Sequence, residues 1–177
     1  MSEPDMRPPN SITLHYDTDE DRLLVVINAG SADAGGYWLT RRLALRFIEA
    51  ANPFLDRMSP VVGKTPAELH DELATMEREV ALASTQGNMS RTPTAALESA
   101  SAAAELAVEL TISRERQSFR LKLRGRKGGE MALDYSRALL QRIVHEVEQE
   151  AAKAGWREGP PAAPPPTDAK EAKRRAH

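Results

Sequence analysis

The order of predicted elements repeats along the chain, and this repetition constrains the fold more than any other feature. In each half, three segments with a strand pattern precede one segment with a helical pattern. The first half carries them at residues 11–17, 23–27, 36–39 and 41–58. The second half carries them at residues 106–112, 118–124, 130–133 and 135–154. Alternation of apolar and polar residues predicts half-buried strands, and apolar spacings of three and four predict helices. The chain is therefore expected to contain two strand–strand–strand–helix units.

The two halves also share the residues that punctuate their elements. Gly35-Gly36 aligns with Gly128-Gly129, and Leu39-Thr40 aligns with Leu133-Asp134, at an offset of about 93 to 96 residues. Short polar side chains accept hydrogen bonds from the first free N–H groups of a helix. Thr40 and Asp134 are accordingly predicted to be the N-caps of the two helices.

These units predict an α+β fold in which antiparallel sheets are packed by helices. A single sheet with one helix leaves one face uncovered, so two units, side by side or face to face, are expected to cover apolar surface with pseudo-two-fold symmetry. Pro53 lies inside the first helical segment. Because proline lacks a backbone donor, we expect it to kink or end that helix near Ala51.

The chain divides into six segments by pattern and composition. A disordered N-terminus, the first unit, an amphipathic helix, a linker or Ala-rich helix, the second unit and a disordered proline-rich basic tail are predicted. They span residues 1–10, 11–58, 65–86, 87–105, 106–156 and 157–177, respectively. The Ala/Ser/Thr-rich stretch at 90–104 is compatible with both a linker and a helix.

The segment 65–86 has the pattern of an amphipathic helix with an acidic polar side. Thr65, Pro66 and Glu68 suit the N-cap, the first helical position and a capping box. The apolar side consists of Leu69, Leu73, Met76, Val80 and Ala83. This stripe is expected either to pack on the protein's own sheet or to dock a partner or a second copy of the chain.

Composition excludes several classes of function. The 177 residues include no cysteine, so disulfides, thiolate catalysis and zinc sites with sulfur ligands are absent. Met1–Asn10 lacks the apolar core of a signal peptide, and no apolar run has the roughly 20 residues that a membrane span needs. We expect a soluble cytoplasmic protein. Its net charge of −2 means that any affinity for nucleic acid must come from a local basic patch.

Three patterns point weakly to chemistry. Asp17, Asp19 and Asp21 alternate like the first ligands of a calcium loop, but no glycine or closing glutamate follows, so a solvated turn is favoured. The glycines of residues 125–129 lack the spacing of a phosphate-binding loop and favour a hairpin turn. The four histidines are not paired with ligands or bases. We therefore expect no catalytic residues, no metal site and no cofactor, and a protein that is not an enzyme.

A cluster of basic residues is the strongest functional pattern in the sequence. It consists of Arg114, Arg116, Arg120, Lys122, Arg124, Arg126 and Lys127. On a strand, Arg120, Lys122 and Arg124 project from one face at intervals of about 7 Å, close to the phosphate repeat of an extended nucleic-acid strand. Tyr37 and Trp38 are candidate stacking residues. The alternative is a solvated strand face that discourages aggregation at a sheet edge.

The duplicated unit and the segment 119–134, which reads FRLKLRGRKGGEMALD, resemble Pur-alpha repeats, Whirly proteins and coactivators of the positive-cofactor-four type. The resemblance covers residues 11–58 and 106–154. It implies curved antiparallel sheets with a basic face that binds single-stranded nucleic acid, often in a homodimer. It also implies that Arg120, Lys122, Arg124, Arg126 and Lys127 contact phosphates and that Tyr37 and Trp38 stack on bases. The chain departs from these families in having three predicted strands per unit instead of four and in its acidic helix.

Two functions follow as hypotheses. The first is a non-enzymatic module that binds single-stranded DNA or RNA, or acts in transcription, through the basic strand face. The second is a protein–protein adaptor or assembly factor that acts through the helix 65–86 and the C-terminal tail. No membrane partner is expected.

Overall fold

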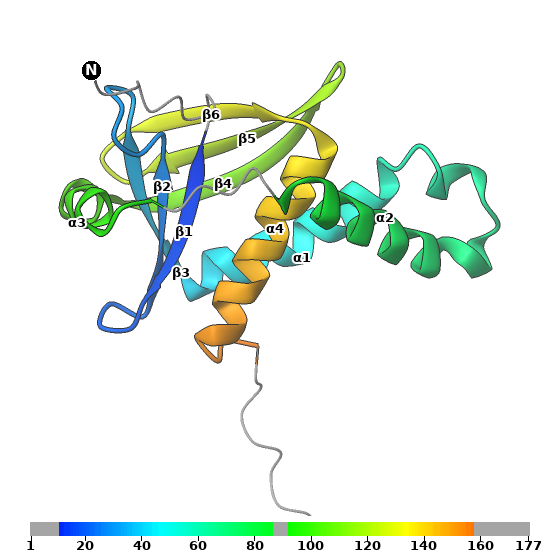
Figure 1. The fold of residues 1–177 in the computed structure, drawn as a ribbon, viewed down its shortest axis with the longest axis horizontal. Helices are drawn as coiled ribbons and strands as arrows, with labels where there is room; N and C mark the ends of the chain where they lie inside the picture. The colour runs from blue at the N-terminus through cyan, green and yellow to red at the C-terminus, as the bar shows by residue number, and fades with distance from the viewer. Residues whose placement is uncertain (1–10, 87–91, 158–177) are drawn as a thin grey trace, which may run out of the picture.

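The computed structural model describes residues 11–86 and 92–157, and this part of the chain forms six strands and four α-helices (Figure 1). The strands are β1 (Ile12–Asp17), β2 (Arg22–Ile27), β3 (Gly35–Thr40), β4 (Glu105–Glu115), β5 (Ser118–Gly125) and β6 (Glu130–Tyr135). The α-helices are α1 (Arg41–Arg57), α2 (His70–Ser84), α3 (Thr94–Ala103) and α4 (Arg137–Lys153). Two short 3₁₀ turns, η1 (Val62–Lys64) and η2 (Ala67–Leu69), precede α2. The α+β class and the strand–strand–strand–helix order are confirmed.

The strands form one sheet in the order of the sequence. Neighbouring strands are antiparallel within each half, whereas β3 and β4 are parallel. This central junction contains two residue pairs, Tyr37 with Glu105 and Trp38 with Leu106. The two halves therefore lie side by side, and Figure 1 shows that β1–β3 and β4–β6 run in clearly different directions around the helices.

The main core lies between one face of this sheet and the helices α1 and α4. Helix α1 buries Ala44, Phe47, Ile48, Ala51 and Leu55. Positions 96 residues further on are Leu140, Ile143, Val144, Val147 and Ala151, all of which α4 buries. The same offset relates the first residues of the two helices, 41 and 137, and their last residues, 57 and 153. Both halves thus use the same helical positions to cover the sheet.

Polar contacts between α1 and α4 are reciprocal. Arg41 Nη2 donates to the carbonyl oxygen of Trp156 at 3.1 Å, and Arg137 Nη2 donates to that of Leu55 at 2.9 Å. Each arginine is the first residue of its helix and reaches a carbonyl near the C-terminal end of the other helix. Each arginine thus adds a side-chain donor near the C-terminal end of the other helix, where the Leu55 carbonyl also accepts from the backbone N–H of Met58.

Helix α3 covers part of the opposite sheet face. Leu24, Val26 and Ala29 are buried there against Trp38 and against α3. Of the two alternatives for residues 90–104, the helix is confirmed from Thr94 to Ala103. The remainder of the predicted linker at 87–91 lies outside the described residues, as do residues 1–10 and the tail 158–177.

Two predicted N-caps are wrong, and of the two alternatives for Pro53 the end of the helix near Ala51 is not observed. Pro53 does not end α1, which continues to Arg57, because the proline is on the exposed side, where water can satisfy the carbonyl group that loses its donor. Thr65 does not cap α2, since its hydroxyl donates to the carbonyl oxygen of Val61 and the helix begins at His70. Asp134 does not cap α4, because strand β6 extends one residue beyond it to Tyr135.

Ser136 is the N-cap of α4 in place of Asp134. Its hydroxyl accepts a hydrogen bond from the N–H of Leu139, as Thr40 accepts one from Leu43 at the start of α1. The predicted cap at Thr40 is confirmed, and the equivalent cap is 96 residues away instead of 94.

A carboxylate joins the C-terminal end of α4 to the turn between β1 and β2. Asp21 Oδ1 accepts hydrogen bonds from Trp156 Nε1 and from Tyr16 Oη, both at 2.9 Å. The hydrogen bond from Trp156, followed by that from Tyr16, lowers the pKa of Asp21 below its ordinary value of 3.8. The ionised form is therefore the one that this contact stabilises.

Replacing Asp21 with Asn, which keeps an acceptor but removes the charge, should lower the urea midpoint at neutral pH. A carboxyl group whose pKa is lower in the folded state stabilises that state above the unfolded-state pKa and loses this contribution as pH falls through the folded-state pKa. The difference between native and D21N proteins should therefore shrink below pH 3.8. Trp156 fluorescence in a W38F background reports the transition, and a pH-independent difference would contradict the role of the charge.

Candidate functional site

The three basic side chains on the outer face of β5 are paired with carboxylates from both neighbouring strands. Arg120 Nε and Nη2 each donate to an oxygen of Asp134 on β6 at 2.8 Å. Lys122 Nζ lies 2.8 Å from Glu130 on β6, and Arg124 Nη2 lies 2.8 Å from Glu109 on β4. The hydrogen bond from Arg120 also lowers the pKa of Asp134. Arg120 Nη1 also lies 3.7 Å from Glu115 on β4, so four carboxylates neutralise the three positive charges on this face.

The other predicted basic residues lie on the helix side of the sheet or in the turns at the two ends of β5. Arg114 points to the helix side of the sheet, where its Nη1 donates to the sulfur of Met58 at 3.5 Å. Arg116 lies in the turn between β4 and β5, whereas Arg126 and Lys127 lie in the turn between β5 and β6. The two turns are separated by the length of an eight-residue strand, roughly 25 Å. Arg114 is thus separated from the row by the sheet, and the turns place the remaining three basic residues at the two ends of β5.

Neither aromatic residue offered as a stacking platform is fully exposed. Tyr37 is 4% exposed in the main core, and burial raises the pKa of its hydroxyl. Trp38 is half-buried in the cluster beneath α3. Nucleic-acid binding stays a prediction for this chain, and this arrangement of charges and rings gives it no support.

The glycine turn at residues 125–129 holds a carboxylate of the protein itself. The Glu105 side chain accepts a hydrogen bond from the backbone N–H of Lys127 at 2.7 Å. A Cβ atom on Gly125 would lie 1.9 Å from Glu105 Cδ, and one on Gly129 would lie 1.9 Å from its Oε1. The turn is therefore a hairpin, as predicted, and its glycines make room for Glu105.

The acidic turn at residues 17–21 also has its oxygens engaged within the fold. Asp17 Oδ1 accepts hydrogen bonds from the backbone N–H groups of Asp19 and Glu20 at 2.9 Å. Among residues 11–86 and 92–157, no group of three or more His, Asp or Glu side chains is arranged to hold a metal ion. In the same ranges, no helix has the length and apolar character that a membrane span requires.

Exposed apolar surface is concentrated around α2. The large apolar residues that are exposed in the described ranges are Val61, Leu69, Met76, Val80 and Val108. All but Val108 precede or belong to α2, and Met76 and Val80 are 54% and 67% exposed. Figure 1 shows that α2 projects from the body of the protein beside α4.

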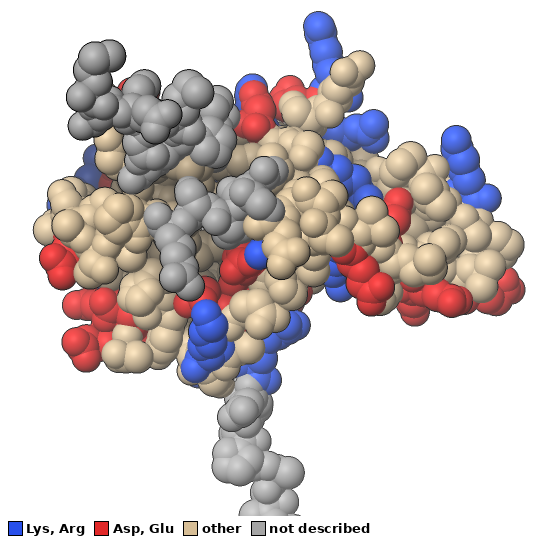
Figure 2. All heavy atoms as spheres, in the orientation of Figure 1, with Lys and Arg blue, Asp and Glu red and all other residues tan. Residues whose placement is uncertain are grey.

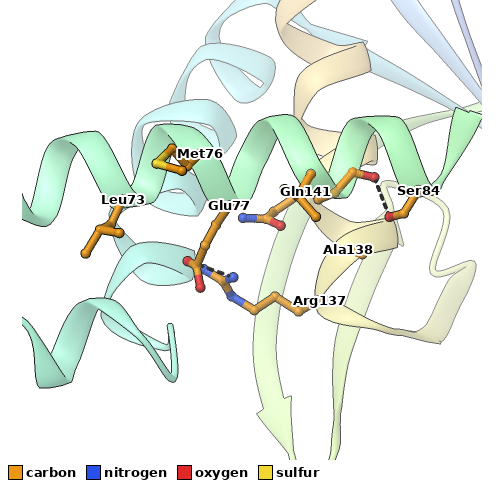
Figure 3. A pocket seen from close by; sticks show the side chains of 9 residues that line it. Leu73, Met76, Glu77, Ser84, Arg137, Ala138 and Gln141 are labelled. Carbon is orange, nitrogen blue, oxygen red and sulfur yellow. Dashed lines mark hydrogen bonds and ion pairs between the residues drawn. The ribbon is translucent and has the colours of Figure 1, made fainter.

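Helix α2 attaches to the body through small residues instead of its large apolar ones. Ala74 and Ala81 are its buried residues. Next to them, Glu77 pairs with Arg137 of α4 at 3.1 Å, and both side chains are 19% exposed (Figure 3). Ser59 donates a further hydrogen bond to Glu77 at 2.9 Å. Of the two alternatives for the apolar stripe, packing on the protein's own sheet is not what α2 does.

An open groove of about 420 Å³ lies between α2 and the first turns of α4. Its walls are mostly apolar and consist of Leu73, Met76, Glu77, Val80, Ala81, Ser84, Arg137, Ala138 and Gln141. Figure 3 shows Glu77 and Arg137 turned toward each other between the two helices, with Leu73 and Met76 further along α2. In other proteins, hydrophobic grooves are one of the surfaces that bind the apolar face of an amphipathic helix.

The comparisons with known proteins identify no relative. No family model, no curated protein and no solved structure matches this chain. The resemblance to Pur-alpha, Whirly and positive-cofactor-four proteins therefore stays a prediction, and function must be argued from the geometry.

Removing the three carboxylates that lie 2.8 Å from the basic row should create affinity for nucleic acid. The E109Q/E130Q/D134N variant is expected to bind a fluorescent oligo-dT at about 50 mM salt and to release it at about 200 mM, because counterion release drives such binding. The native chain should not bind. The control E68Q/E72Q/E79Q changes the net charge equally, in η2 and α2. If the native chain bound oligo-dT as tightly as the variant, the idea that the carboxylates neutralise the basic row would be refuted.

Substitution of Gly125 by Ala should destabilise the protein by about 1–3 kcal/mol, since the new Cβ would overlap Glu105. In an E105A background the same substitution should cost much less, and urea denaturation of the double-mutant cycle measures this coupling. Gly63→Ala is the matched control, because no atom lies within 4 Å of its added Cβ. An equal cost in both backgrounds would contradict the proposed contact.

Proposed function

We propose that this protein is a non-enzymatic adaptor that binds a helix of another protein in the groove between α2 and α4. The observation that carries the proposal is the exposure of Leu69, Met76 and Val80 along one side of α2 and its preceding turn. Contiguous apolar patches on a folded protein mark interaction sites more often than isolated apolar residues do.

The energy available on this surface suits a specific complex. Burial of a large aliphatic side chain contributes about 1.5–3 kcal/mol relative to exposure. Met76 and Val80 flank the groove together with half-buried Leu73, so one partner helix can contact all three. Binding energy at such interfaces is concentrated in a few apolar anchors at the centre of the contact.

The Glu77–Arg137 pair gives the groove a fixed shape. Each partner has a second contact, Glu77 with Ser59 and Arg137 with the carbonyl of Leu55. These contacts hold α2 against α1 and α4, so a ligand helix meets a surface formed before binding. Preorganisation of this kind reduces the entropic cost of association.

The M76S/V80S variant should lose partners that the native chain captures. Because two apolar anchors are removed, we expect enrichment of bound proteins to fall tenfold or more, where tenfold is about 1.4 kcal/mol. Affinity capture with quantitative mass spectrometry, supported by photo-crosslinking from position 76, measures the loss.

Val108→Ser is the matched control, because it removes an exposed valine from β4, away from the groove. Both variants should keep the native thermal midpoint, since the substituted side chains are exposed. Retention of the same partners by M76S/V80S would refute the adaptor function of this surface.

A further inference from the structure

The apolar residues beside the groove have the spacing of a helix-pairing seam. Leu69, Leu73, Met76, Val80 and Ala83 are separated by four, three, four and three residues. This is the alternation of the a and d positions in a heptad, which pairs one helix with another along its length. The matching ligand is a helix whose apolar residues follow the same spacing.

Uncompensated acidic residues run along the solvent side of this seam. Glu72 and Glu79 occupy the same flanking position in successive heptads of α2, and Glu68 lies in the turn η2 directly before the helix. All three are exposed, and within the described residues none of them forms an ion pair. Figure 2 shows acidic side chains gathered along one side of the projecting α2 segment. The other side of the groove carries Glu77 and Arg137, which neutralise each other.

Charge disfavours a second copy and a membrane surface as occupants, and composition disfavours the two terminal segments. Pairing of α2 with α2 of a second copy would set Glu72 and Glu79 against the same residues, and like charges at such flanks are destabilising. Residues 158–177 contain no Leu, Ile, Val, Phe, Met or Trp to fill the seam, and residues 1–10 contain three prolines. An anionic membrane surface would repel the acidic flank.

We infer that the partner of the α2 groove is an amphipathic helix whose heptad-spaced apolar face is flanked by Lys or Arg. This inference rests on the proposed docking function and adds the chemistry of the ligand. Basic side chains beside the apolar face meet Glu68, Glu72 and Glu79, while the apolar residues enter between Leu73 and Val80. The apolar contact supplies most of the affinity, and the charges select among helices with similar apolar faces.

Three labelled model helices of about 21 residues, or three heptads, test the inference. One has a Leu/Ile seam with Lys and Arg flanks, the second has the same seam with Glu flanks, and the third has basic flanks with Ala in the seam. Fluorescence anisotropy with the full chain should show binding of the first, at least tenfold weaker binding of the second, and none of the third. Raised salt should narrow the difference between the first two.

Variants of the chain test whether peptide binding depends on the groove and on its acidic residues. E72K/E79K should reverse the preference between basic and acidic peptides, M76S/V80S should abolish both interactions, and V108S should leave them unchanged. Equal binding of the basic and acidic peptides would overturn the inferred charge selection and leave the docking function standing. Sedimentation that shows a dimer dissolved by M76S/V80S would assign the groove to a second copy and overturn the inference. Failure of all peptides, together with unchanged capture by M76S/V80S, would overturn both proposals.

Discussion

The burial of matching apolar faces of α1 and α4 against one side of the sheet is the contact on which the rest of the structure depends. Because both helices bury residues at the same five positions, each half covers the sheet in the same way. The parallel junction between β3 and β4 contains only two residue pairs, so the sheet alone joins the halves weakly. Contacts between α1 and α4 also hold the two halves together. Helix α2 in turn packs against α4 beside Arg137.

The alternating pattern of strand β5 predicts which side chains are buried, but it does not show whether the basic side chains on the outer face are free to bind a ligand. Alternation placed Phe119, Leu121 and Leu123 in the core and left the basic residues outside. That part of the prediction depends on one strand and the period of its side chains. Whether the outer row is free to bind phosphates depends on the residues opposite it, Glu109, Glu130 and Asp134, which belong to other strands. Register between strands is a tertiary property, so the neutralisation could not be predicted from β5 itself.

The sequence predicted the periodicity of α2 correctly and left open which side of the helix is buried. The apolar stripe from Leu69 to Ala83 was correctly recognised, but periodicity alone does not show which side of a helix faces the protein. Helix α2 packs through Ala74 and Ala81, seven residues apart, since small side chains allow close approach to α4. The wrong cap at Asp134 has a related cause, because strand β6 continues to Tyr135 and the next short polar residue, Ser136, takes the role.

Helix α2 has no counterpart after the second unit within the described residues, and this asymmetry bears on function. The other helices use their large apolar residues to cover the sheet, whereas α2 adds little to the core and leaves Met76 and Val80 in water. Such exposure weakens solubility and favours association without stabilising the fold. The Glu77–Arg137 pair and the hydrogen bond from Ser59 nevertheless hold the helix in one orientation. A surface that is exposed, apolar and held in one orientation is suited to recognition. The exposure of its apolar side chains to water is unfavourable in the isolated protein, and binding of a complementary helix removes that exposure.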